Sequence, residues 1–309
     1  MTKLSRREAL LRLAAGSAAL MTARTAAGAA RPAQPASILT RRIPSSGKVV
    51  PVIGLGTWQT FDVGSNAAER ATREQVLKEF VQLGGRVIDS SPMYGSSEEV
   101  VGDLVAKLSV RSQLFIATKV WTSGKSRGIQ QMEESLRKLR TRTVELMQVH
   151  NLVDVRTHLE TLREWKRDGR VRYIGVTHYA ASSHDDVARL IDQVPVDFLQ
   201  INYSIGERDA ERRLLPLARE RDVAVIANRP FAGGALFRAL RDRPVPPWAL
   251  EIGCESWAQL MLKFVVSHPA ITCAIPATSS VEHMRDNMGA GVGAMPNEEL
   301  RALIVAAAE

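Results

Sequence analysis

The sequence predicts an α/β protein in which eight parallel strands close into a (β/α)8 barrel. Short runs rich in β-branched and apolar residues alternate with longer runs whose apolar residues recur at helical spacing, and this alternation is typical of parallel α/β folds. The chain has 309 residues, and a barrel of this kind takes about 250. Its 45% hydrophobic and 24% charged residues are ordinary for a globular protein with a large core.

A short hairpin and eight later runs account for the strands of this prediction. The hairpin is expected from residues 41–43 and 48–50, because Ser45, Ser46 and Gly47 between them favour a turn. Each later run has the length of a buried strand and is bounded by turn or helix signals. The expected barrel strands are residues 52–56, 86–90, 114–119, 144–149, 171–176, 197–202, 222–227 and 271–275.

Helix-forming runs separate these strands. Residues 68–83 carry Phe80 and Leu83 on one face, as expected for a helix that packs on a sheet. The segment 159–165 shows the same spacing and is followed by Asp168 and Gly169, a typical helix end. The other expected helices are residues 97–107, 128–140, 183–192, 209–220, 256–267 and 298–308.

The alternative fold is a doubly wound open sheet. Such a sheet usually carries a glycine-rich turn after its first strand, and residues 54–58 supply Gly-x-Gly without a third glycine that opens a helix. We therefore expect the closed barrel. In a barrel, the carboxyl ends of the strands and the loops after them build the active face.

Composition and charge exclude several classes of protein. The net charge is +8, but residues 1–29 hold five basic residues and one acidic residue, so +4 of it lies there. No run of Lys and Arg is interleaved with aromatic residues, so nucleic acid is not an expected partner. The two cysteines, Cys254 and Cys273, cannot build a disulfide framework, and no metal-ligand pattern is recognisable.

Four polar residues at strand ends carry the functional prediction. Asp89, Lys119 and His150 end three successive expected strands or follow them directly, and Tyr94 lies in the loop after the first of the three. Because the carboxyl ends of barrel strands meet on one face, we expect the four side chains to converge on one pocket.

The chemistry of these side chains fits the reduction of a carbonyl group, which needs a hydride on carbon and a proton on oxygen. A tyrosine can supply the proton if its pKa falls from about 10 toward neutral, and a neighbouring ammonium favours that fall. We expect Asp89 to hold Lys119 in its charged form. His150 is expected to orient the substrate oxygen by a hydrogen bond.

The segments around these residues resemble those of the aldo-keto reductase family. Residues 87–95, Val-Ile-Asp-Ser-Ser-Pro-Met-Tyr-Gly, resemble the family's D-x-A-x-x-Y-G segment, with serine in place of the usual alanine. Residues 117–119 and 148–150 are similar to its lysine and histidine segments. The resemblance extends over roughly residues 41 to 289.

The resemblance implies a TIM barrel that reduces aldehydes or ketones to alcohols with NAD(P)H. It also implies a role for each of the four residues. Tyr94 is the general acid, Lys119 and Asp89 are the pair that tunes it, and His150 orients the substrate.

Later segments resemble the family's contacts with the cofactor. The resemblance implies that Thr177, His178 and Gln200 hold the nicotinamide carboxamide, with His178 standing where the family has asparagine. It places Arg229 near the pyrophosphate, whereas Asn228 stands where the family often has a tyrosine that stacks on the nicotinamide ring. The predicted cofactor-binding residues are Gly56, Thr57, Asp89, Thr177, His178, Gln200, Arg229, Pro230, Ala277, Thr278, Ser279, His283 and Asn287.

The resemblance favours NADP(H) as cofactor and leaves NAD(H) as an alternative, because Ala277 and His283 stand where some members place lysine and arginine. For the substrate, Trp58, Met93 and Trp121 follow the first three strands and should line a pocket for a small apolar carbonyl compound. Family members with long C-terminal tails use them to cover the substrate. Only 22 residues follow Asn287 here, so we expect an open pocket.

Two other functions remain alternatives. A barrel that binds a nicotinamide cofactor can serve as a redox sensor or accessory subunit with little turnover, as some relatives do. An isomerase or aldolase can use a lysine such as Lys119 to form a Schiff base.

The first residues of the chain predict a twin-arginine signal peptide over residues 1–29. Residues 5–7, Ser-Arg-Arg, precede apolar residues as in the S-R-R-x signature. The weakly apolar stretch 13–21 is shorter than the roughly 20 residues that span a bilayer, so we expect no stable membrane span in the mature chain. Small residues at 26–30 offer a cleavage site.

This signal implies the twin-arginine export machinery as a partner, with an amphipathic N-terminal helix as the alternative. The expected location is periplasmic or otherwise extracytoplasmic, reached in the folded state with the cofactor bound. Residues 30–40 contain prolines and alanines and are expected to be a linker. Residues 41–309 are the predicted barrel domain.

Overall fold

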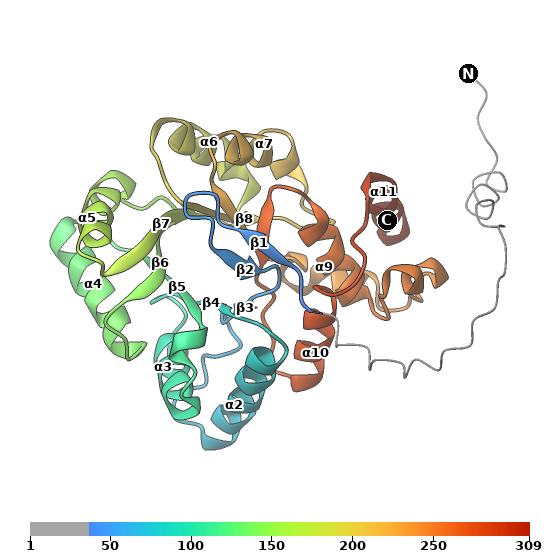
Figure 1. The fold of residues 1–309 in the computed structure, drawn as a ribbon, viewed down its shortest axis with the longest axis horizontal. Helices are drawn as coiled ribbons and strands as arrows, with labels where there is room; N and C mark the ends of the chain where they lie inside the picture. The colour runs from blue at the N-terminus through green and yellow to red at the C-terminus, as the bar shows by residue number, and fades with distance from the viewer. Residues whose placement is uncertain (1–36) are drawn as a thin grey trace, which may run out of the picture. The chain divides into compact units, whose positions relative to one another are not determined.

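Eight parallel strands curl around a common axis and are ringed by helices (Figure 1) in the part of the chain that the computed structural model describes, residues 37–309. Each strand pairs with the next one in the sequence, so the predicted barrel order is confirmed. The strands are β3 (Leu55–Gly56), β4 (Val87–Asp89), β5 (Phe115–Val120), β6 (Val144–His150), β7 (Val171–Thr177), β8 (Phe198–Asn202), β9 (Ala224–Asn228) and β10 (Ile271–Ala274).

The sheet closes between its first and last strands. Ala274 N–H donates to Val52 O and Gly54 N–H donates to Ala274 O, both at 2.8 Å, and Ile53 pairs with Ala274 in a parallel bridge. These hydrogen bonds satisfy backbone groups that an open sheet would leave at its edges. The alternative of a doubly wound open sheet is therefore wrong.

Helices cover the outside of the barrel between successive strands. None of those in residues 37–309 is both long enough and apolar enough to cross a membrane. The α-helices are α2 (Ala67–Gln82), α3 (Ser97–Leu108), α4 (Lys125–Lys138), α5 (Val155–Arg167), α6 (His184–Gln193), α7 (Leu214–Glu220), α8 (Ala235–Ala239), α9 (Trp257–Ser267), α10 (Val281–Gly289) and α11 (Glu298–Ala308). Short 3₁₀ turns occur at η1 (Arg111–Gln113), η2 (Ala181–Ser183), η3 (Asp209–Glu211), η4 (Ala232–Gly234) and η5 (Pro247–Ile252).

Helix α10 lies where the sequence suggested only a cofactor-binding segment. Ser280 is its N-cap, and its hydroxyl accepts a hydrogen bond from His283 N–H at 3.3 Å. Met284 and Met288, four residues apart, are buried on its inner face. Two methionines in a polar stretch are a weak periodic signal, which explains why the helix was not predicted.

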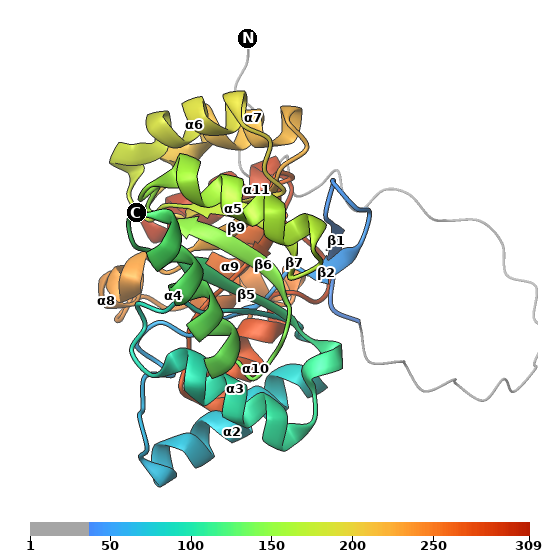
Figure 2. The ribbon, with the colours of Figure 1, turned by 90° about the vertical axis from the view of Figure 1, so that its left-hand side faces the viewer.

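The predicted hairpin forms from β1 (Thr40–Arg42) and β2 (Val49–Pro51) and closes the amino end of the barrel. Phe115, Tyr173 and Phe198 fill the interior there, with ring centroids 5.5–5.8 Å apart. Ile43 packs into the same buried cluster, and the Ser46 hydroxyl lies 2.7 Å from the Tyr173 hydroxyl. Figure 2 shows the hairpin and α8 at opposite ends of the barrel.

The last helix, α11, is fixed to the barrel by one arginine. Arg301 donates hydrogen bonds to the Tyr203 hydroxyl at 2.7 Å and to the Ser267 hydroxyl at 2.9 Å, and lies 3.0 Å from the Glu211 carboxylate. The guanidinium also packs 4.2 Å from the centroid of the Phe264 ring. These contacts hold α11 against α9 and the loop after β8.

Candidate active site

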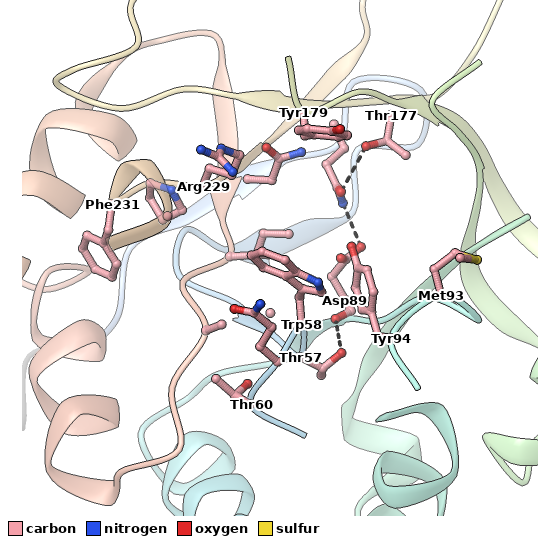
Figure 3. A pocket seen from close by; sticks show the side chains of 18 of the residues that line it. Thr57, Trp58, Thr60, Asp89, Met93, Tyr94, Thr177, Tyr179, Arg229 and Phe231 are labelled. Carbon is pink, nitrogen blue, oxygen red and sulfur yellow. Dashed lines mark hydrogen bonds between the residues drawn. The ribbon is translucent and has the colours of Figure 1, made fainter. Parts of the chain in front are cut away.

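A cavity of about 600 Å³ opens at the carboxyl ends of the strands. This volume lies within the range of roughly 300–1,000 Å³ that is usual for small-molecule sites. Asp89, Tyr94 and His150 line it, together with Thr177 and Gln200 from the next two strands (Figure 3). The side chains that the sequence singled out therefore do converge on one pocket.

Lys119 and Asp89 form a buried ion pair next to this cavity. Neighbouring strands β4 and β5 place them together, and Lys119 Nζ donates to Asp89 Oδ2 and to Ser90 O, both at 2.6 Å. The two residues are 0% and 2% exposed. Burial alone lowers the pKa of Lys119, but the charge of Asp89 and the contact with Tyr94 outweigh it, so the pKa lies above its ordinary value. Lys119 is therefore an ammonium at neutral pH.

Tyr94 lies between this ammonium and the cavity. Lys119 Nζ is 4.9 Å from the centroid of its ring. Burial raises the pKa of the Tyr94 phenol, and the opposing charge of Lys119 is itself offset by Asp89, so the pKa stays above its ordinary value. The expectation that Lys119 brings this pKa toward neutral is wrong, because a dehydrated phenol meets a cation that is already paired. Tyr94 therefore keeps its proton at neutral pH.

His150 is the neutral partner of Tyr94. Burial, followed by the charges of Lys119 and His178, lowers the pKa of His150 to about 3. Its ring meets the Tyr94 ring edge-on, with centroids 6.2 Å apart at 87°. The Nδ1 atom lies 3.3 Å from the Ser91 hydroxyl. A neutral imidazole donates from one nitrogen and accepts at the other.

A chain of hydrogen bonds leads from Asp89 across the barrel. Gln200 Nε2 donates to Asp89 Oδ1 at 2.7 Å, and the Thr177 hydroxyl donates to Gln200 Oε1 at 3.1 Å (Figure 3). Gln148 also donates to Asp89 Oδ1, at 3.3 Å. Sequence reasoning missed Gln148, although a glutamine in the apolar run before His150 was an available signal. These hydrogen bonds fix the position of Asp89 and leave the Gln200 amide with one free N–H and one free lone pair.

Gly56 and Thr57 bring backbone close to the cavity on the side of the first strand. A Cβ atom at Gly56 would lie 2.7 Å from Ile275 O, so only glycine fits where the barrel closes. The buried Thr57 side chain donates to Asp89 O at 3.0 Å. Both residues line the cavity.

Arg229 provides a cation on the opposite wall. Its backbone has φ of 51°, and its guanidinium lies 3.6 Å from the Glu207 carboxylate. Within residues 37–309, Arg229 Nε and the Oδ1 atoms of Asn151 and Asn228 are buried without hydrogen-bond partners. All three residues line the cavity, although these three atoms are themselves buried.

Five of the predicted cofactor-binding residues do not line the cavity. His178 Nδ1 accepts hydrogen bonds from the backbone N–H groups of Tyr179 and Ala180, at 3.1 and 3.2 Å, which ties the ring to its own loop. Thr278 Oγ1 accepts from Ser280 N–H at 3.1 Å. The roles of these five stay predictions, whereas Pro230 and Ala277 do line the cavity. The five are His178, Thr278, Ser279, His283 and Asn287.

Apolar side chains surround the mouth of the cavity. Trp58, Met93 and Trp121 line it as expected and remain 47%, 44% and 37% exposed. Sequence reasoning missed Tyr179 and Phe237, which also line it and are exposed. Tyr179 lies in the loop after β7 and Phe237 in the short helix α8, and no periodic pattern announces either position. None of the described residues after Ala277 contributes to the lining, and the open pocket stays a prediction.

Fold and site together define a barrel enzyme in which a protonated phenol and a neutral imidazole lie side by side in one cavity. Lys119 does not line the cavity, and its ammonium is held by two oxygen atoms. The alternative of Schiff-base chemistry on Lys119 therefore has no support, because that chemistry needs an accessible neutral amine.

The chain belongs to the aldo/keto reductase family, whose model matches residues 52–304. It is similar to the methylglyoxal reductase YeaE of Escherichia coli (strain K12), with 29% identity over 255 residues, which are 80% of this chain and 88% of that protein. The family resemblance and the TIM barrel prediction are confirmed.

Solved structures agree with this assignment. An aldo/keto reductase from Klebsiella pneumoniae in complex with NADP and acetate is 28% identical, with a TM-score of 0.70 over 84% of this chain and 91% of that chain. A second structure, of an aldo-keto reductase from Klebsiella pneumoniae in complex with NADPH, is 27% identical, with a TM-score of 0.72 over 88% and 94%.

Proposed function

We propose that the protein reduces the carbonyl group of small aldehydes or ketones with a hydride from NADPH. The observation that carries the proposal is a protonated Tyr94 held against the buried Lys119 ammonium beside the neutral His150. Family membership supports it, as do relatives that bind NADP or NADPH and one that is a methylglyoxal reductase.

The polar atoms of the cavity fit a nicotinamide dinucleotide. Thr177 and Gln200 are assigned to the carboxamide. Arg229 and the turn at Gly233 and Gly234 are assigned to the pyrophosphate, since a guanidinium suits phosphate oxygens and a backbone without side chains allows their close approach. Gly56, Thr57, Asp89, Pro230 and Ala277 complete this part of the site.

The adenosine end is assigned to the start of α10, through Thr278, Ser279, His283 and Asn287. Ser279 and His283 are exposed there, and Arg73 from α2 approaches to 3.5 Å of Ser279 O. A cation beside the exposed Ser279 hydroxyl suits a 2′-phosphate. NADP(H) is therefore the proposed cofactor.

The side chains of the site then divide the work on the substrate. NADPH, when bound, supplies the hydride. The Tyr94 hydroxyl and an N–H of His150 donate to the carbonyl oxygen, which orients and polarises it. Tyr94 then transfers its proton to that oxygen. The Lys119 ammonium stabilises the phenolate that remains, and Asp89 keeps Lys119 charged.

A pair of tyrosine variants tests this proposal. Tyr94→Phe should lower the rate of NADPH oxidation with methylglyoxal or 4-nitrobenzaldehyde by about 10²–10⁴-fold, the usual contribution of a general acid. Tyr173→Phe removes another buried phenol, bonded to Ser46 at the far end of the barrel, and should keep the wild-type rate. Equal rates in the two variants would contradict the proposal. NADPH binding without turnover of any carbonyl compound would support the sensor alternative instead.

Melting shifts test the choice of cofactor. A ligand at 100 times its Kd adds about 2.7 kcal/mol to the free energy of unfolding, so the tighter cofactor gives the larger shift at equal concentration. We expect a larger shift with NADPH than with NADH, and a smaller shift with both for Arg229→Ala. Equal shifts with the two cofactors would remove the preference for NADP.

We also propose export of the folded, cofactor-loaded protein by the twin-arginine machinery to the periplasm or another extracytoplasmic compartment, directed by residues 1–29, which lie outside the described residues. The Ser-Arg-Arg signature supports it. Replacing Arg6 and Arg7 together by lysine should leave the protein in the cytoplasmic fraction at its full length. An unchanged distribution between fractions would contradict the proposal.

A further inference from the structure

Ser91 occupies a special place between the ion pair and the imidazole. It lies in the loop after β4, two residues beyond Asp89 and three before Tyr94, and its side chain is 0% exposed. Its hydroxyl oxygen has two polar neighbours among residues 37–309. Met93 N–H donates to it at 3.3 Å, and His150 Nδ1 lies 3.3 Å from it.

The proton of this hydroxyl has one available acceptor. A buried hydroxyl group is almost always hydrogen-bonded, because leaving it unpaired incurs its full desolvation cost. Met93 N–H can only donate, so it occupies a lone pair of the Ser91 oxygen and offers no place for the Ser91 proton. His150 Nδ1 is therefore the acceptor, and it carries no proton of its own.

The tautomer of His150 follows from this assignment. Because the imidazole is neutral, it has one N–H, and an accepting Nδ1 leaves that N–H on Nε2. The His150 ring lines the cavity beside Tyr94, so a donor on Nε2 is the one that the reaction needs. The opposite tautomer would present a lone pair where the substrate oxygen approaches.

We propose that Ser91 is a positioning residue, which selects the Nε2–H tautomer of His150 and so keeps both donors of the site aimed at the substrate oxygen. The effect of Ser91 on the reaction rate rests on the proposed function, but the assignment of the His150 tautomer does not. Ser91 stands where the resemblance places alanine, which has no hydroxyl and cannot make this contact.

Nitrogen NMR of protein labelled with ¹⁵N-histidine at pH 7 reads the tautomer directly. The chain has six histidines, and the signals of His150 are those that disappear in His150→Gln. We expect the pure Nε2–H pattern in the wild-type protein and an average of the two tautomers in Ser91→Ala. An Nδ1–H pattern or an average in the wild type would overturn the proposal, as would an unchanged pattern in Ser91→Ala.

Single-turnover oxidation of NADPH measures the effect of Ser91 on the reaction rate. Ser91→Ala should lower this rate about 3- to 10-fold, the factor that corresponds to one neutral hydrogen bond, with little change in KM. Ser91→Cys, which keeps a donor at the same position on a somewhat larger and weaker group, should fall in between and replaces Ser91→Ala if that variant does not fold. Ser135→Ala removes a buried hydroxyl bonded to Glu98, away from the cavity, and should keep the wild-type rate.

The outcomes separate this inference from the proposed function. Wild-type rates in Ser91→Ala would overturn the positioning role, as would equal losses in Ser91→Ala and Ser135→Ala. If the wild-type protein reduces no carbonyl compound, the proposed function fails, while the NMR pattern still decides the tautomer of His150.

Discussion

Replacing Lys119 by methionine should destabilise the fold as well as the chemistry. Methionine fills much of the same space but leaves the Asp89 carboxylate, 2% exposed, without its cation. Removing one partner of a buried ion pair costs about 3–5 kcal/mol. Asp89 keeps the Gln200 amide at 2.7 Å and the Gln148 amide at 3.3 Å, so we expect the lower end, about 3 kcal/mol.

Urea unfolding followed by tryptophan fluorescence measures this loss. The matched control is Lys107→Met, because Lys107 lies the same 2.6 Å from its partner Glu74 but has a side chain that is 64% exposed. An exposed pair contributes about 0–1 kcal/mol. Adding Asp89→Asn to Lys119→Met should restore part of the stability, because the unpaired charge is removed. The reasoning is refuted if Lys119→Met costs no more than Lys107→Met.

Three further predictions follow from other parts of the structure. The rate of carbonyl reduction should stay constant between about pH 5 and pH 9 and fall only above about pH 10. The proton on Tyr94 is lost only as the pH rises through its raised pKa, and His150, with a pKa of about 3, stays neutral throughout this range. A fall centred near pH 7 in a pH–rate profile would contradict this prediction. Arg301→Ala should lower the urea midpoint by the equivalent of about 2–3 kcal/mol, since its bonds to charged and polar partners are lost, while kcat stays unchanged. Gly56→Ala should cost about 1–3 kcal/mol from overpacking against Ile275 O and weaken NADPH binding in a fluorescence titration; wild-type affinity would contradict the tight contact.

The order of strands and helices could be predicted from the sequence, because buried strands and amphipathic helices leave different periodicities. The predicted ends of the helices and strands were less accurate. β9 begins at Ala224, two residues later than expected, because Asp222 has φ of 54° and Val223 N–H is still bonded to Ala218 O at the end of α7. A residue in the left-handed region cannot belong to a strand, and nothing in the local residue types announces it.

The four residues of the site could be recognised because they carry unusual chemistry at strand ends. The contacts of their partners could not be predicted. Gln148 was visible as a glutamine in an apolar run and Ser91 as a serine in place of alanine, but their contacts with Asp89 and His150 depend on distances between strands. The direction of the Tyr94 pKa was also beyond reach, because it depends on how far burial outweighs a cation that another group already neutralises.

Arg301 holds α11 on the flank of the barrel, away from the mouth of the cavity, and this placement limits how far the protein can select substrates by their size. No described residue beyond Ala277 closes over the ring of Trp58, Trp121, Tyr179 and Phe237. We therefore expect that a carbonyl group carried on a long chain or a fused ring system can place its reactive end at Tyr94 while the rest of the molecule extends into water. Selection among such compounds is then expected to depend on the groups around the reacting carbon and not on length.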